Sequence, residues 1–133
     1  MIFFDTNVLV YYTINQDEEK QKTSERLIEE AITDGLFFIS PLIMMEYIFV
    51  LAKLKILSEN HDKIIFFSKF IKSEISTNVT MEAYTLCKTE SCCKNINDVI
   101  HLKVAQKYCT KLLSYDSDFK KLQKHTNIEI EIL

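Results

Sequence analysis

The stretch Ile2-Phe3-Phe4-Asp5-Thr6-Asn7 decides the fold, because three apolar residues lead directly into a carboxylate, a hydroxyl and an amide. The apolar character continues in Val8-Leu9-Val10, and the run predicts a strand that is buried on both faces. A carboxylate at the end of a buried strand is costly unless hydrogen-bond donors or a cation compensate its charge. Asp5 therefore predicts a site whose other members come from elsewhere in the chain.

The composition is that of an ordinary globular protein. The 133 residues are 47% hydrophobic and 26% charged, which predicts one domain over residues 1–133. A single Gly and a single Pro argue against a Gly-rich phosphate-binding loop. The longest apolar stretch, 36–52, is interrupted by Ser40, Pro41 and Glu46, so we expect no membrane span. The cysteines lack paired spacing, so we expect reduced thiols in a cytoplasmic protein; they are Cys87, Cys92, Cys93 and Cys109.

Strand and helix patterns alternate along the chain. This alternation predicts an α/β fold with three α/β/α layers and a mainly parallel central sheet. Besides the first strand, we expect strands at 36–39, 111–115 and 128–132, the last at a sheet edge, with 75–79 as a weaker candidate. We expect a solvent-facing connection at 15–22 and helices at 24–32, 41–57, 58–72, 80–87, 98–108 and 119–124.

Two acids directly follow predicted strands. In parallel sheets, ligands bind at the carboxyl ends of the strands, and Asp5 and Asp116 both lie there. Asp118 is either a second ligand or the N-cap of the following helix, and we favour the cap. Ser114 and Thr6 flank the strand ends, where hydroxyl groups can bridge carboxylates.

Two further acids each leave two interpretations open. Glu46 lies in an apolar helical segment, 42–50, and is either held in a cleft or exposed on one helix face with Lys53. Asp98 is favoured in the first turn of a helix that Asn95 or Asn97 caps. Capping is the stronger local interpretation of Asp98, and it is compatible with a carboxylate that points into a cleft.

Several acids in one cleft would repel each other, and a divalent cation would remove this repulsion. Mg²⁺ and Mn²⁺ prefer hard oxygen ligands of this kind. Asn7, two residues after Asp5, is expected to donate a hydrogen bond to the Asp5 carboxylate. His101, one helical turn after Asp98, is expected on the surface, with the cleft mouth as the less favoured alternative.

These segments together resemble the PIN-domain ribonucleases, most closely the small VapC-type toxins of prokaryotic toxin–antitoxin pairs. The matching segments are Phe4-Asp5-Thr6-Asn7-Val8-Leu9, Glu46 in the helix after Ser40-Pro41, Asn97-Asp98, and Leu112-Leu113-Ser114-Tyr115-Asp116-Ser117-Asp118-Phe119. The resemblance implies a metal-dependent endoribonuclease that hydrolyses RNA phosphodiester bonds. It implies that Asp5, Glu46, Asp98 and Asp116 are catalytic and hold one or two Mg²⁺ or Mn²⁺ ions. Supporting roles are expected for Thr6, Asn7, Ser114 and Asp118.

The resemblance also implies partners. These are an RNA substrate, a cognate antitoxin protein and a second copy of the chain in a homodimer, with apolar helices at 42–57 and 62–72 as a candidate groove. Candidate contacts to the RNA backbone are Lys53, Lys55, Lys88, Lys94, Lys103 and Lys107. The alternative is a catalytically inactive PIN-like module that binds RNA or protein. The presence of all four acids argues against that alternative.

Overall fold

Four parallel strands form the centre of the computed structural model, which describes residues 1–90 and 94–133. The strand order is β2-β1-β3-β4, where β1 is Ile2–Phe4, β2 is Phe37–Phe38, β3 is Lys111–Ser114 and β4 is Glu129–Ile132. Phe3 pairs with Phe38 on one side and with Leu112 on the other. Because the strands are parallel, their carboxyl ends lie at one edge of the sheet, where Asp5 and Asp116 follow β1 and β3.

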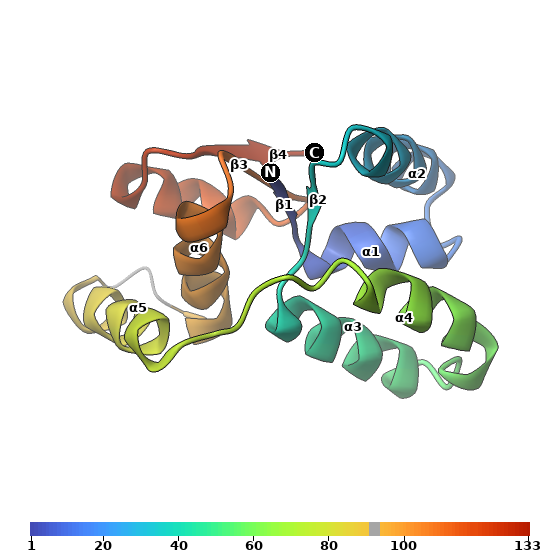
Figure 1. Ribbon diagram of the computed structural model, residues 1–133, viewed down its shortest axis with the longest axis horizontal. Helices are drawn as coiled ribbons and strands as arrows, with labels where there is room; N and C mark the ends of the chain where they lie inside the picture. The colour runs from blue at the N-terminus through green and yellow to red at the C-terminus, as the bar shows by residue number, and fades with distance from the viewer. Residues whose placement is uncertain (91–93) are drawn as a thin grey trace.

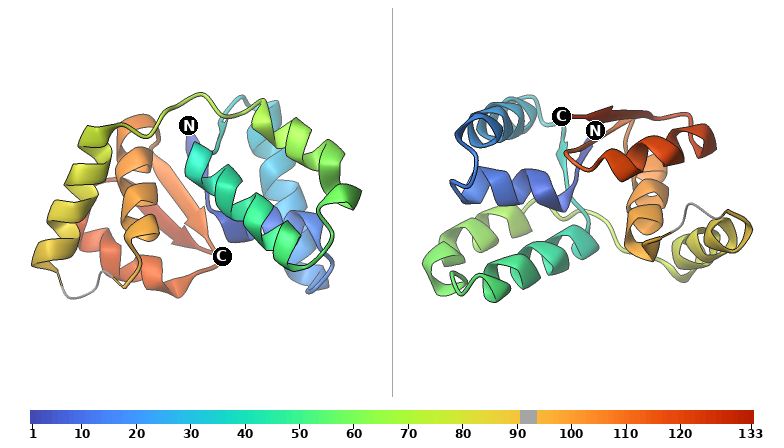
Figure 2. Two further views of the ribbon diagram at one scale, coloured as in Figure 1. Left: turned by 90° about the horizontal axis from the view of Figure 1, so that it is seen from below. Right: turned by 180° about the vertical axis from the view of Figure 1, so that it is seen from behind.

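Helices lie on both sides of this sheet, as Figures 1 and 2 show. On one side lie α5 (Thr77–Thr89) and α6 (Ile96–Tyr108). On the other lie α1 (Thr6–Thr13), α2 (Glu18–Thr33), α3 (Pro41–Lys53) and α4 (His61–Ser68). Two 3₁₀ segments, η1 (Ser58–Asn60) and η2 (Ser117–His125), complete the described elements. The predicted three-layer α/β/α architecture with a parallel sheet and an edge strand at the end of the chain is confirmed.

Aromatic side chains fill the core around β1. Phe3 and Phe4 are fully buried, and the ring of Phe4 lies 4.8 Å from that of Phe37 on β2. Phe67 of α4 contacts both Phe37 and the buried Tyr47 of α3, at ring distances of 5.9 and 5.7 Å. Burial of each such side chain contributes about 1.5–3 kcal/mol, so this packing fixes β1 and the Asp5 that follows it.

Short polar side chains start the helices. Asp5, Asp17, Ser40, Ser76 and Asn95 are the N-caps of α1, α2, α3, α5 and α6, and each accepts a hydrogen bond from a backbone N–H group of the first turn. Three predicted boundaries were wrong for this reason. Residues 8–10 belong to α1 and not to a strand, α2 begins at Glu18 within the predicted connection, and α5 begins at Thr77 within the weak strand candidate.

The expectation that the cysteines are reduced thiols was wrong for Cys87. Cys109 is a buried free thiol, but Cys87 is disulfide-bonded, which the spacing of cysteines in the sequence does not indicate. Cys92 and Cys93 lie outside the described residues. No helix in the described part of the chain combines the length and apolarity needed to span a bilayer.

Candidate active site

Asp5 is fixed at the junction of β1 and α1. As the N-cap of α1, its carboxylate accepts a hydrogen bond from the Thr6 backbone N–H at 2.8 Å. Its own backbone N–H donates to the Leu113 carbonyl of β3 at 3.0 Å, which extends the strand pairing by one residue. The side chain is only 6% exposed, so its charge depends on neighbouring protein groups.

Ser114 at the end of β3 supplies the second donor to Asp5. Its hydroxyl donates to Asp5 Oδ2 at 2.5 Å and accepts from the Asp116 backbone N–H at 2.9 Å. The side-chain amide of Asn7 donates to the same hydroxyl at 3.1 Å, and its oxygen accepts from the Tyr115 backbone N–H. Asn7 therefore acts on Asp5 through Ser114, whereas we expected a direct hydrogen bond. The Ser114 hydroxyl joins the Asp5 carboxylate to a backbone N–H group, whereas we expected a bridge between carboxylates.

Glu46 of α3 faces the site and accepts three hydrogen bonds. Thr6 Oγ1 and His101 Nε2 donate to Oε2 at 2.5 and 3.0 Å, and Asn97 Nδ2 donates to Oε1 at 2.8 Å. The side chain is 25% exposed, so it lines the cleft and is not displayed on an outer helix face with Lys53. Ser40 caps α3 and Pro41 occupies its first turn, as the sequence predicted, and this start directs Glu46 towards Asp5.

His101 of α6 is part of this group, and the expectation of a surface position was wrong. Its side chain is 1% exposed and its ring lies 5.7 Å from that of Phe3. One ligand atom from each of Asp5, Glu46 and His101 lies within 4.8 Å of the other two. The local sequence hid this position because α6 is apolar on its inner side and His101 replaces one apolar residue of that side.

Asp98 and Asp116 line a cavity of about 120 Å³ beside this group. Asp98 lies in the first turn of α6, whose cap is Asn95, and accepts a long 3.4 Å hydrogen bond from the Asn95 amide. Asp116 is the N-cap of η2 and accepts from the Asp118 backbone N–H at 2.9 Å. The cap is therefore Asp116, whereas we assigned it to Asp118. Lys94 and Lys121 also line this cavity.

The carboxylates influence each other electrostatically. Burial raises the pKa of Asp98 to about 6, and the charges of Asp5, Asp116 and Glu46 add to this effect. Burial also raises the pKa of Asp5, although His101, Ser114 and Thr6 oppose the shift. Burial of Glu46 by itself would also raise the pKa of this carboxyl. Its hydrogen bonds and its contact with His101 outweigh burial, so the pKa of Glu46 is lowered.

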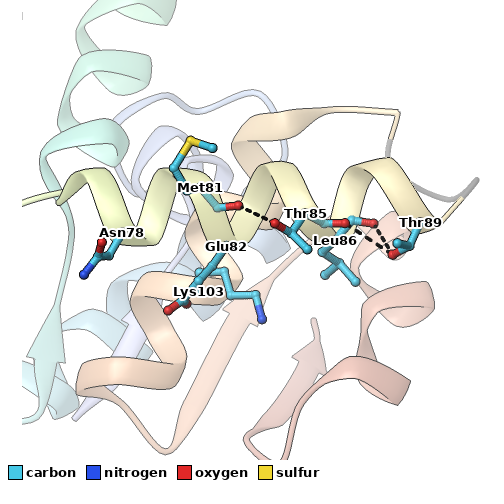
Figure 3. Close-up of a pocket in the computed structure, with 7 residues that line it drawn as sticks. All are labelled: Asn78, Met81, Glu82, Thr85, Leu86, Thr89 and Lys103. Atoms are coloured by element: carbon cyan, nitrogen blue, oxygen red, sulfur yellow. Dashed lines mark hydrogen bonds between the residues drawn. The ribbon is translucent and has the colours of Figure 1, made fainter.

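A second cavity, of about 520 Å³, lies between α5 and α6 (Figure 3). Its lining includes Glu82, Leu86 and Met81 of α5 and Lys103 of α6. None of the four acids predicted to be catalytic is among its lining residues. The chemistry of a candidate active site therefore belongs to the smaller, acidic cavity.

Comparison with known proteins agrees with the geometry. The family model of the PIN domain matches residues 2–125. The chain belongs to the PIN domain family. No curated protein sequence matches this PIN domain, whereas several solved structures do.

Three of these structures illustrate the likeness. VapBC2 from Rickettsia felis, bound to a DNA fragment from its promoter, has a TM-score of 0.68 and 19% identity over 99% of this chain and 98% of that chain. VapC20 from Mycobacterium tuberculosis, described as a toxin that cleaves the sarcin-ricin loop, has a TM-score of 0.76 and 16% identity over 92% and 95%. A toxin–antitoxin complex from Klebsiella pneumoniae has a TM-score of 0.65 and 21% identity over 98% and 100%. At these identities the likeness is one of fold, and the TM-scores show it.

The donor set of this PIN domain fits a hard divalent cation. Asp5 and Glu46 meet at the carboxyl end of β1, and Asp98 and Asp116 line the neighbouring cavity. Burial is the main cause of the raised pKa of Asp98, and the charges of Asp5, Asp116 and Glu46 add to it. A cation beside them would favour the ionised form of each acid. Oxygen ligands of this kind suit Mg²⁺ or Mn²⁺, which keep part of their water shell.

Proposed function

We propose that this PIN domain is a metal-dependent endoribonuclease in which Asp5, Glu46, Asp98 and Asp116 hold one or two Mg²⁺ or Mn²⁺ ions. The observation that carries the proposal is the meeting of Asp5 and Glu46 within 4.8 Å at the carboxyl end of β1, beside a cavity that Asp98 and Asp116 line. Sites in parallel α/β sheets form at this edge.

The bound metal would supply an activated water and neutralise charge on the reacting phosphate. The protein positions the carboxylates that would hold the metal. Ser114 and the Thr6 backbone N–H fix the two oxygens of Asp5, while the Thr6 hydroxyl and Asn97 fix Glu46. These hydrogen bonds hold the two carboxylates in the positions of metal ligands before the substrate binds. By analogy with the family, the products would carry 5′-phosphate and 3′-hydroxyl ends.

Lys94 and Lys121 are suited to bind the RNA backbone near the cut. Both residues line the same cavity as Asp98 and Asp116, and the amine of Lys121 lies 4.0 Å from Asp118 in a long, solvent-exposed ion pair. Such a pair is weak, so a phosphate can compete for the amine. Lys94 was among the lysines considered from the sequence, whereas Lys121 was not.

Cleavage of RNA tests the proposal directly. Protein freed of any partner would be incubated with RNA and Mg²⁺ or Mn²⁺, with EDTA as a control. Asp5→Asn should lose at least about 100-fold in rate, because a ligand is at least as important as the outer groups that support it. Glu74→Gln, an exposed acid between α4 and α5, is the matched control and should cleave like the wild type.

The result also separates the enzyme from a binding module. An inactive PIN-like module would bind RNA or protein without cleaving it, and Asp5→Asn would then behave like the wild type. Calorimetric titration with Mn²⁺ adds a second readout, because a catalytically dead scaffold has no need to retain metal affinity. Absence of metal-dependent RNA cleavage by correctly folded wild-type protein would overturn the proposal.

We further propose that the protein is the toxin of a type II toxin–antitoxin pair and binds a cognate antitoxin. Support comes from the likeness to VapBC2 and to the toxin–antitoxin complex from Klebsiella pneumoniae. Apolar side chains on the outer faces of α3 and α4 offer a surface for such a partner or for a second copy of the chain. They include Met45, Phe49, Leu54, Ile65 and Phe66, which are 36–66% exposed.

The partner proposal has its own measurement. The chain would be co-expressed with the product of a short neighbouring gene for a DNA-binding protein. Light scattering would then measure the molar mass of the purified protein or complex. A stable complex that inhibits RNA cleavage supports the antitoxin, and the mass of the chain alone reports the homodimer. No complex with the neighbouring product would count against the toxin–antitoxin assignment.

A further inference from the structure

His101 occupies a buried position where an apolar residue would ordinarily be expected. It lies one turn after Asp98 on α6, its side chain is 1% exposed, and its ring lies 5.7 Å from that of the buried Phe3 of β1. A polar side chain at such a position costs free energy unless it makes hydrogen bonds. The burial of this imidazole therefore depends on the hydrogen bonds that it makes.

The hydrogen bonds of His101 define that function. An ionised carboxylate can only accept, so the imidazole Nε2 carries a proton and donates it to Glu46 Oε2 at 3.0 Å. Among the described residues, Nδ1 of His101 has no hydrogen-bond partner. Among the described residues, Glu46 is thus the only hydrogen-bond partner of this buried side chain.

The two oxygens of Glu46 are occupied unequally. Oε2 accepts from both His101 and the Thr6 hydroxyl, which uses both of its lone-pair directions. Oε1 accepts a single hydrogen bond, from Asn97, among the described contacts. One lone pair of Oε1 therefore remains available to a cation.

We propose that His101 is a positioning residue that holds Glu46 Oε2 and so presents Oε1 to the metal ion. This inference rests on the proposed metal-dependent function. It assigns His101 to the second layer around the ion and leaves the metal ligands as carboxylate oxygens. Outer groups that orient ligands in this way typically change metal affinity by about 10- to 100-fold.

The competing geometry is direct coordination by His101. One ring nitrogen of His101 belongs to the same 4.8 Å group as one oxygen each of Asp5 and Glu46, and Nε2 is the nitrogen that faces Glu46. Direct coordination needs the Nε2 lone pair, so it requires that nitrogen to lose its proton and its hydrogen bond to Glu46. The two geometries therefore predict opposite tautomers of His101 in the metal-bound protein.

Metal affinity of three variants tests the proposal. Mn²⁺ titrations would compare the wild type with His101→Leu and His101→Gln at fixed pH and ionic strength. Leu fills a similar apolar volume without a donor, so the affinity should fall about 10- to 100-fold. The Gln side-chain amide can donate from near the position of Nε2, so His101→Gln should recover most of the affinity. His61→Leu, which changes an exposed histidine of α4, should match the wild type.

Thermal unfolding in EDTA separates positioning from a structural role. If His101 serves Glu46 and not the fold, His101→Leu should unfold without metal at the wild-type temperature or above it. Should His101→Leu fail to fold, ¹⁵N NMR of the His101 ring in the wild type and the affinity of His101→Gln decide the question. A proton retained on Nε2 after addition of Mg²⁺ is expected.

Three results would overturn the inference. They are wild-type Mn²⁺ affinity in folded His101→Leu, loss of affinity in a folded His101→Gln equal to that in His101→Leu, and loss of the Nε2 proton when Mg²⁺ binds. A wild-type protein that binds no Mn²⁺ overturns the proposed function as well. A wild type that binds Mn²⁺ while His101→Leu binds it equally overturns the role of His101 alone.

Discussion

Ser114 and Asp5 are 109 residues apart in the chain, and their side chains share a buried 2.5 Å hydrogen bond at the ends of adjacent strands. We predict that Ser114→Ala lowers the free energy of unfolding by about 1–3 kcal/mol, because Asp5, Asn7 and the Asp116 N–H group each lose a partner. Urea unfolding would measure the change. Ser68→Ala removes an exposed hydroxyl that donates to a carbonyl of its own helix, and it should cost much less.

Asp98 should destabilise the metal-free protein at neutral pH. Its pKa in the folded protein, about 6, lies above the ordinary value of 3.8, so folding favours the protonated carboxyl. That contribution is complete below about pH 3.8 and is lost as the pH rises through about 6. In EDTA near pH 8, Asp98→Asn should therefore raise the free energy of unfolding by on the order of 1 kcal/mol, because solvent screens this half-buried group. Equal unfolding curves at that pH would contradict the prediction.

Metal affinity should fall in mild acid because of the same carboxyl. Bound metal needs ionised Asp98, so Mn²⁺ binding should weaken as the pH drops through about 6. Glu46, whose pKa is lowered, should remain ionised in that range. Calorimetric titrations at several pH values would follow the loss, and Asp98→Asn should remove this step. A pH-independent affinity in the wild type would exclude Asp98 as a ligand.

The two faces of α3 should respond differently to truncation. Tyr47 is fully buried, its hydroxyl shares a 2.7 Å hydrogen bond with Thr13, and Tyr47→Ala should cost about 3–5 kcal/mol of stability. Phe49 is 66% exposed, and Phe49→Ala should change stability by less than about 0.5 kcal/mol. If the outer face of α3 binds the proposed antitoxin, Phe49→Ala should instead weaken that complex. Thermal unfolding and a pull-down with the partner would measure the two effects.

The sequence was informative where a local pattern reports the environment. Asp5 stands out because an apolar run ends on it, and Ser40-Pro41 correctly placed the start of α3. The strand predicted over residues 8–10 failed because Asp5 caps a helix there, and a cap decides the start of a helix whatever the propensity of Val8 and Val10. The misplaced cap of η2 has a similar cause, because Asp116 and Asp118 both lie at the start of this segment and local sequence does not decide between them.

The residues that contact Glu46 could not be predicted from local sequence patterns. Thr6, Asn97 and His101 reach its carboxylate from positions 40, 51 and 55 residues away, so only the packed fold reveals them. Nothing near His101 in the sequence distinguishes a buried histidine from one on the surface. A helical wheel of α6 places it on the same face as the apolar Val104 and Ala105, and this is the one signal that the sequence offers.

The order of strands in the sheet has a consequence for the newly made chain. Asp5 is synthesised before its neighbours at the end of β3, because Ser114 lies 109 residues later in the chain. Until Ser114 and Asp116 have emerged from the ribosome, β1 lacks one of its neighbours and the carboxylates are not assembled. A nascent chain that still lacks β3 is therefore expected to be inert towards RNA, and the proposed nuclease would become active only after β3 has been made.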